Sequence, residues 1–176
     1  RIIRELHTMG IEVQVVTSAV RPIPPEWTEF PNLHLVVSID GLQPEHDERR
    51  KPATYERILK HIDGHQITVH CTVTRQQVQR DGYLEEFIRF WSANESVRTI
   101  WVSLYTPQVG EVSDEQLRPE DRARVVADLM HLRQVFPKLQ MPEGLIRVYA
   151  DPPANPDECV FALTTTCVSA DFKRPI

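Results

Sequence analysis

Four short apolar runs, interspersed with helical patterns, constrain the fold of this 176-residue chain more than any other feature. The runs are rich in the β-branched residues that favour strands, and they cover residues 11–18, 33–40, 67–74 and 99–105. Apolar stripes with helical spacing cover residues 55–62 and 84–91, and a longer one begins at Pro119 and ends before Pro137. Nearly continuous apolar strands that alternate with helices predict an α/β fold, a parallel sheet covered by helices. A weaker run, residues 145–150, is interpreted as a fifth strand.

Both ends of the sequence suggest a piece of a longer protein. The first residues carry an apolar helical stripe that Gly10 closes, with no initiator methionine before it. The last residues stop at Ile176 without a terminating helix. We therefore expect a fragment. A proline-rich stretch, residues 150–158, predicts a boundary between an α/β body, residues 1–150, and the start of a C-terminal extension, residues 151–176.

Composition argues against several classes of protein. The formal net charge of −5, with no basic run interleaved with aromatics, argues against nucleic acid as a partner. No apolar run approaches the roughly 18 residues that a membrane span needs, and no signal peptide opens the chain. The three cysteines, an odd number without secretory features, favour a reducing cytoplasmic setting over a disulfide scaffold.

Polar side chains gather where the predicted strands end. Because side chains alternate along a strand, each of these sets shares one face of the sheet: Ser38 with Asp40; His70 with Thr72 and Thr74; Trp101 with Ser103 and Tyr105. Ligands of parallel α/β folds bind beyond the carboxyl ends of the strands. Ser and Thr also end strands simply by satisfying turns. Several strands that finish alike favour a polar ligand site.

The segments "VVSIDG", "HDERR" and "TYERILKHI" resemble the fourth strand and following helix of the radical S-adenosylmethionine (radical SAM) superfamily. The matching residues are Ser38, Ile39, Asp40, Gly41, His46, Asp47, Arg50 and Tyr55. Thr17-Ser18-Ala19 stands where the family often has Thr-Asn-Gly, and residues 67–78 and 100–111 resemble the fifth and sixth strands. The resemblance implies the C-terminal portion of a partial (β/α)6 TIM-like barrel, with mostly parallel strands.

The same resemblance implies an iron–sulfur enzyme, an oxidoreductase in the broad sense. Such an enzyme reductively cleaves S-adenosylmethionine to a 5′-deoxyadenosyl radical, which abstracts hydrogen from a substrate that the sequence does not identify. Flavodoxin or ferredoxin would donate the electron. The family's Cys-x3-Cys-x2-Cys loop, which holds a [4Fe–4S] cluster, and its Gly-Gly-Glu segment do not occur in this sequence. Either both lie upstream of Arg1, and this fragment alone is inactive, or the chain is a member without the cluster.

In that reading, six residues would bind the cofactor or face it: Ser38, Asp40, Arg50, Thr72, Thr74 and Ser103. Arg50 would pair with the carboxylate of S-adenosylmethionine through two parallel hydrogen bonds, which a lysine cannot reproduce. Ser38 would hydrogen-bond the carboxylate or the ribose. Asp40 has an alternative role, which is to cap or fix the turn at Gly41.

Two further features leave alternatives open. His46 and Asp47 resemble the metal pair of His-Asp phosphohydrolases, so the second hypothesis is a metal-dependent phosphohydrolase or a non-catalytic α/β binding module. No other ligand has a suitable spacing, which favours a structural turn. Cys159 and Cys167 lie beyond the proline-rich boundary. They are either ligands of an auxiliary iron–sulfur cluster, completed by residues after Ile176, or ordinary buried thiols.

Overall fold

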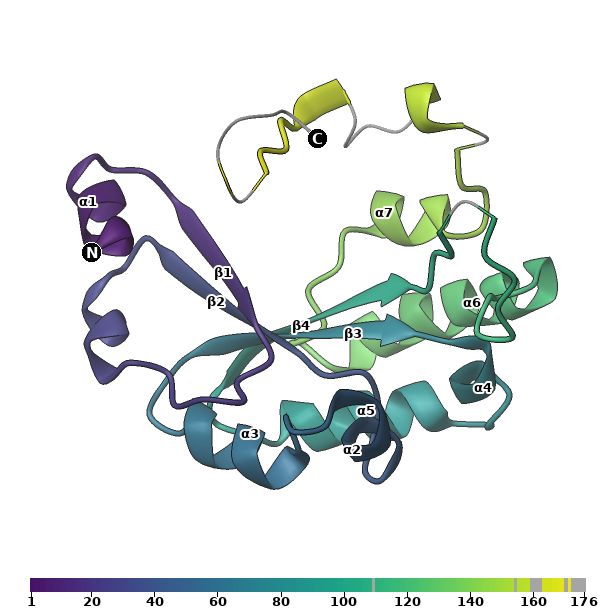
Figure 1. Ribbon diagram of the computed structural model, residues 1–176. Helices are drawn as coiled ribbons and strands as arrows, with labels where there is room; N and C mark the ends of the chain where they lie inside the picture. Colours follow the sequence, from purple (N-terminus) through teal and green to yellow (C-terminus); the bar gives the residue numbers. More distant parts are fainter. Residues whose placement is uncertain (109, 154, 159–162, 170, 172–176) are drawn as a thin grey trace.

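The computed structural model describes residues 1–108, 110–153, 155–158, 163–169 and 171. Its centre is a four-stranded parallel sheet in the order β1-β2-β3-β4 (Figure 1). The strands are β1 (Val13–Thr17), β2 (Leu33–Ser38), β3 (Ile67–Val73) and β4 (Val97–Leu104). Each lies within two residues of a predicted apolar run at its N-terminal and C-terminal ends. The α/β class and the parallel sheet are therefore confirmed.

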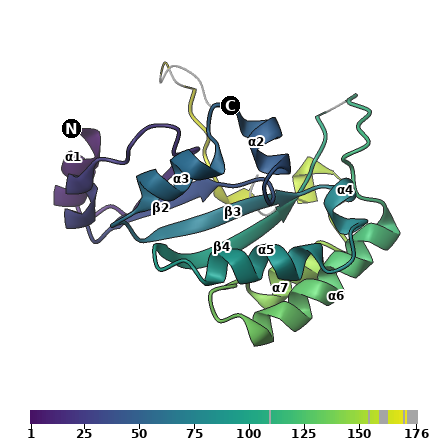
Figure 2. The same cartoon turned by 90° about the horizontal axis from the view of Figure 1, so that it is seen from below.

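Helices connect the strands, as parallel pairing requires. They are α1 (Ile2–Thr8) before β1; α2 (Glu45–Arg50) and α3 (Tyr55–Ile62) between β2 and β3; α4 (Arg75–Val78) and α5 (Tyr83–Ser92) between β3 and β4; and α6 (Pro119–Val135) and α7 (Glu143–Val148) after β4. Short 3-10 helices span Pro25–Glu29 and Pro156–Glu158. Figures 1 and 2 show α3 and α5 against one face of the sheet, with α6 and α7 beyond β4. No helix in the described ranges is both long and apolar enough to cross a membrane.

The hydrophobic core lies between the sheet and α5. Phe87, Ile88 and Trp91 are fully buried on this helix. They meet the face of β3 that carries Val69 and Cys71, which are also buried. Burial alternates along β3, where every second residue is buried and the residues between are half-buried. The sheet therefore has one apolar, covered face and one polar face that remains partly open, which the nearly continuous apolar runs did not reveal.

The prediction of a fifth strand at residues 145–150 is wrong, because α7 occupies most of that run. Pro142 precedes the helix, and Glu143 pairs with Arg147 one turn later, at 2.6 Å. Ile146 is fully buried. The chain instead meets the outer edge of β4 at residues 138–139, where Lys138 O accepts a 2.7 Å hydrogen bond from Ile100 N–H.

The two phenylalanines of α5 provide a test of the core. Phe87→Ala should lower the free energy of unfolding by about 3–5 kcal/mol, because the ring is fully buried and its removal leaves a cavity. Phe90→Ala, on the same helix but 44% exposed, should cost about 1 kcal/mol, mainly from lost ring contacts with Tyr55 and Trp91. Urea titrations of both variants measure the difference. Equal losses would contradict the placement of the core.

Candidate functional site

The candidate site is built around Asp40, which follows β2 and is 6% exposed. Its Oδ2 accepts a hydrogen bond from Arg50 Nε at 2.5 Å, and Arg49 Nε lies 3.4 Å from the same oxygen. Its Oδ1 is buried and has no hydrogen-bond partner in the part of the chain that the structure describes. Asp40 therefore holds Arg50 through Nε alone. Neither terminal nitrogen of Arg50 has an acceptor among the described residues.

The neighbouring arginine has a different role. Arg49 donates from both terminal nitrogens to the two carboxylate oxygens of Glu115, with Nη2 and Oε2 2.8 Å apart. This hydrogen-bonded pair raises the pKa of Arg49. Arg49 thus ties α2 to the loop after β4 and is fully engaged. Of the two adjacent arginines, only Arg50 keeps both terminal nitrogens unpaired among the residues that the structure describes.

His46 is structural. The residue is fully buried in α2, its Nδ1 accepts the Asp40 N–H at 3.1 Å, and its Nε2 donates to Ala53 O at 2.8 Å. Burial lowers the pKa of His46, which keeps the ring neutral. Asp47 accepts hydrogen bonds from Tyr55 N–H and from the Gln43 amide, each at 2.7 Å. The predicted turn here is in fact the first part of a helix, and both ring nitrogens of His46 are used.

The turn at Gly41 is fixed by side chains from α4 and α5. Gly41 has a φ of +148°, and a Cβ there would lie 2.7 Å from Tyr83 Oη and 2.9 Å from Gln77 Nε2. Gln77 Nε2 donates to Asp40 O at 2.8 Å, and Tyr83 Oη accepts the Leu42 N–H at the same distance. Only glycine fits this close approach. Gln77 and Tyr83 carry no sequence signal of this role, since neither belongs to a motif.

Ser38 and the polar face of the sheet adjoin this turn. In the sheet register Ser38 lies beside His70, and His70 lies beside Trp101. Burial lowers the pKa of His70, against the opposing effect of the Asp40 charge, so the ring is neutral near pH 7. The sequence already placed His70 and Trp101 on the same face as the predicted hydroxyl residues, but it did not single them out as ligand-binding residues.

The three hydroxyl residues predicted on β3 and β4 divide into two groups. Thr72 and Ser103 are half-buried on the polar face, with their hydroxyl oxygens 3.3 Å apart. Thr74 is buried at the start of α4, where its N–H donates to Gln77 Oε1 at 2.9 Å. The structure therefore places Ser38, Asp40, Arg50, Thr72 and Ser103 at one end of the sheet, and it gives Thr74 a capping position.

The cysteines do not form a metal site within the described ranges. Cys71 is buried in β3, and burial raises the pKa of its thiol, so it is an inert packing residue. Cys167 is exposed and free, and Cys159 lies outside the described residues. Among the residues that the structure describes, no group of three or more His, Cys, Asp or Glu side chains could hold a metal ion. An auxiliary iron–sulfur cluster at Cys159 and Cys167 stays a prediction.

No family model, curated protein or solved structure matches this chain. Functional inference therefore depends on the residue pattern and on the geometry at the carboxyl end of the sheet. That geometry presents a preorganised guanidinium fork, an unpaired buried carboxylate oxygen and a half-buried face of hydroxyl, imidazole and indole groups. Together these can bind a small ligand that carries a carboxylate and several hydrogen-bond donors.

Stability below neutral pH tests the role of His46. Because burial lowers the pKa of His46 in the folded protein, the unfolded chain takes up the proton first, near pH 6.5. The free energy of unfolding should be constant above that pH and should fall as the pH drops toward the folded-state pKa. His70 should contribute in the same direction.

His46→Gln should therefore reduce the pH dependence, and the further change His70→Gln should reduce it again. Urea unfolding between about pH 5 and pH 8 measures both slopes. His131→Gln, at an exposed histidine of α6, is the matched control and should leave the slope unchanged. A His46→Gln slope identical to that of the wild type would show that His46 is not held neutral in the fold.

Proposed function

We propose that this chain forms the S-adenosylmethionine-binding wall of a radical SAM enzyme, in which Arg50 binds the carboxylate of the methionine moiety. One observation carries the proposal. Asp40 fixes the Arg50 guanidinium through Nε and leaves both terminal nitrogens without an acceptor among the described residues. A guanidinium held in this way is preorganised for a carboxylate. It lies at the carboxyl end of the strands, where parallel α/β folds bind ligands.

The residues around Arg50 suit the other groups of S-adenosylmethionine. The unpaired Oδ1 of Asp40 is a buried acceptor, and leaving it unsatisfied costs about 1–3 kcal/mol, which a ligand ammonium or hydroxyl would offset. Ser38 offers a hydroxyl beside the same turn. Trp101 offers an aromatic surface on the polar face. These residues bind and orient the ligand, whose sulfonium supplies a bond that a reducing electron can cleave.

In this proposal the four strands belong to a partial (β/α)6 barrel, with the polar face of the sheet inside. The resemblance supports that arrangement, and so does the asymmetry of the sheet, because the interior of such a barrel carries the ligand. The [4Fe–4S] cluster would be held by residues outside these 176, and flavodoxin or ferredoxin would supply its electron. In this proposal the substrate lies against the polar face of the sheet, beyond Thr72 and Ser103.

The metal-dependent phosphohydrolase alternative rested on His46 and Asp47. Both nitrogens of His46 are hydrogen-bonded within the fold, and Asp47 accepts two hydrogen bonds from Tyr55 and Gln43. Neither side chain is directed to a shared metal position, so this alternative loses its metal pair. A non-catalytic binding module remains the competing hypothesis. Such a module would bind S-adenosylmethionine under reducing conditions without cleaving it, whereas an enzyme would cleave it.

Replacement of Arg50 tests the proposal. Arg50→Ala should lose about 1.5–3 kcal/mol of S-adenosylmethionine binding, because a charge-assisted pair with the carboxylate disappears. Arg50→Lys should recover little of the loss, since a point charge cannot reproduce the fork. Isothermal titration calorimetry of the anaerobically purified protein measures both affinities.

Arg98→Ala is the matched control, because Arg98 is an exposed arginine of β4 that makes no ion pair in the structure described. It should bind S-adenosylmethionine as the wild type does. Wild-type affinity in Arg50→Ala would remove Arg50 from the site. Binding without any cleavage of the ligand by the reduced, cluster-containing protein would favour the non-catalytic module.

A further inference from the structure

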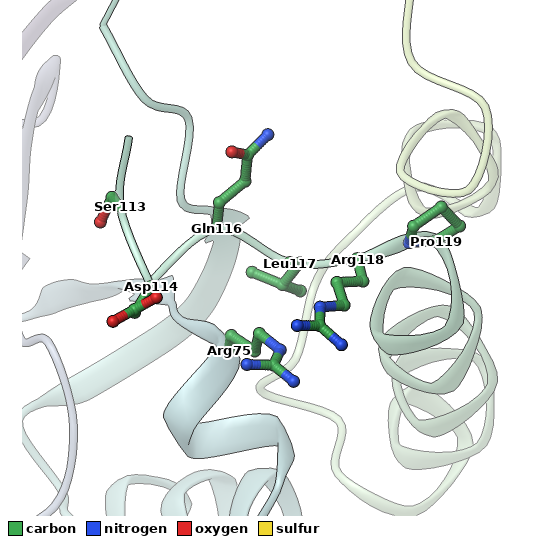
Figure 3. Close-up of a pocket in the computed structure, with 7 residues that line it drawn as sticks. All are labelled: Arg75, Ser113, Asp114, Gln116, Leu117, Arg118 and Pro119. Atoms are coloured by element: carbon green, nitrogen blue, oxygen red, sulfur yellow. The ribbon is translucent and has the colours of Figure 1, made fainter. Parts of the chain in front are cut away.

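A hollow lies at the same end of the sheet, between the start of α4 and the start of α6. It has a volume of about 300 Å³, and its lining includes Arg75, Asp114, Arg118 and Pro119 (Figure 3). This volume is at the lower end of the range for small-molecule sites. None of these residues belongs to the site around Arg50.

One buried carboxylate oxygen here accepts hydrogen bonds from two arginines, from the side chain of Arg75 and from the backbone of Arg118. Asp121 is 5% exposed, and its Oδ2 accepts hydrogen bonds from Arg75 Nε at 3.2 Å and from the backbone N–H of Arg118 at 3.0 Å. The terminal nitrogens of Arg75, and the whole guanidinium of Arg118, have no acceptor in the described ranges of the chain. The hollow therefore presents unused guanidinium N–H donors, while the carboxylates of Asp114 and Asp121 equal the two arginines in formal charge.

The directions of the two arginine side chains bring these donors together. Figure 3 shows the guanidinium groups of Arg75 and Arg118 turned toward one another, while the Asp114 carboxylate and the Gln116 amide point away from them. The two guanidinium charges repel each other; Asp121 pairs with Arg75 only through Nε, and a bound anion would pair with the N–H donors that Asp121 leaves free. The hollow also adjoins the N-terminus of α6, where Pro119 has no N–H and the carboxylates of Glu120 and Asp121 already supply negative charge to the helix dipole.

We propose that this hollow binds a phosphoryl group. Two guanidinium groups offer more donors, in more directions, than a planar carboxylate can accept, and they suit a tetrahedral dianion.

Glu115 also joins the hollow to the first site. Its carbonyl accepts the Arg75 N–H at 2.9 Å, and its carboxylate holds Arg49, the residue next to Arg50. Glu115 and Arg49 therefore link the loop that lines the hollow to α2, the helix that carries Arg50. The substrate class that follows, which rests on the proposed function, is a phosphorylated compound whose phosphoryl group contacts Arg75 and Arg118.

Titration with inorganic phosphate tests the hollow directly. The wild-type protein should bind phosphate saturably, and Arg118→Gln should weaken it at least about tenfold, because a charge-assisted pair is lost. Arg75→Gln should weaken binding similarly. Arg98→Gln is the matched control and should not change the affinity. Calorimetry at constant ionic strength measures all four proteins. No saturable binding by the wild type, or equal affinity in Arg118→Gln, would overturn the proposal.

Further measurements separate this proposal from the first. Arg50→Ala should keep wild-type phosphate affinity, and Arg118→Gln should keep wild-type S-adenosylmethionine affinity. Phosphate and S-adenosylmethionine should bind together, and competition between them would contradict two adjacent sites. Succinate should bind at least about tenfold more weakly than phosphate. If succinate binds as tightly, and Arg118→Gln weakens both ligands, the hollow is a carboxylate site and the phosphoryl assignment is wrong.

Discussion

The buried aspartate after β2 is the interaction on which the candidate site depends. Its backbone N–H is held by His46, its carbonyl by Gln77 and its carboxylate by Arg50. A buried carboxylate is tolerated only when it is paired, so Asp40 and Arg50 need each other. The consequence is that α2 is anchored against the end of the sheet, with one guanidinium aimed at the space beyond it.

The asymmetry of the sheet decides where a ligand can lie. One face is filled by α5 side chains such as Phe87 and Trp91, and it has no room for another molecule. The other face carries hydroxyl, imidazole and indole groups that are only half-buried. Parallel sheets normally bury both faces, so the polar, partly open face is where the proposed ligand would lie. The free fork of Arg50 stands at the carboxyl end of that face.

Adjacent arginines with opposite roles show how the fold distributes charge. Both terminal nitrogens of Arg49 are hydrogen-bonded to Glu115, which links α2 to the loop after β4. Arg50 is bound only on Nε. Arg75 repeats the second arrangement at the neighbouring hollow, where Asp121 holds its Nε. In both places a buried aspartate orients a guanidinium and leaves its outer edge free, which is the arrangement that anion recognition requires.

The sequence by itself determined the four strands and the long helices, because local periodicity carries that information, and a short contiguous motif singled out Ser38, Asp40 and Arg50 as candidate site residues. It did not decide residues 145–150, since a short apolar run suits a strand or a helix equally, and the Glu143–Arg147 pair one turn apart favours the helix. The contacts that shape the site join residues far apart in the chain. Glu115 lies 66 positions from Arg49, and Gln77 lies 37 positions from Asp40. Only tertiary structure brings such side chains together, because no local pattern records which distant groups will share a buried charge.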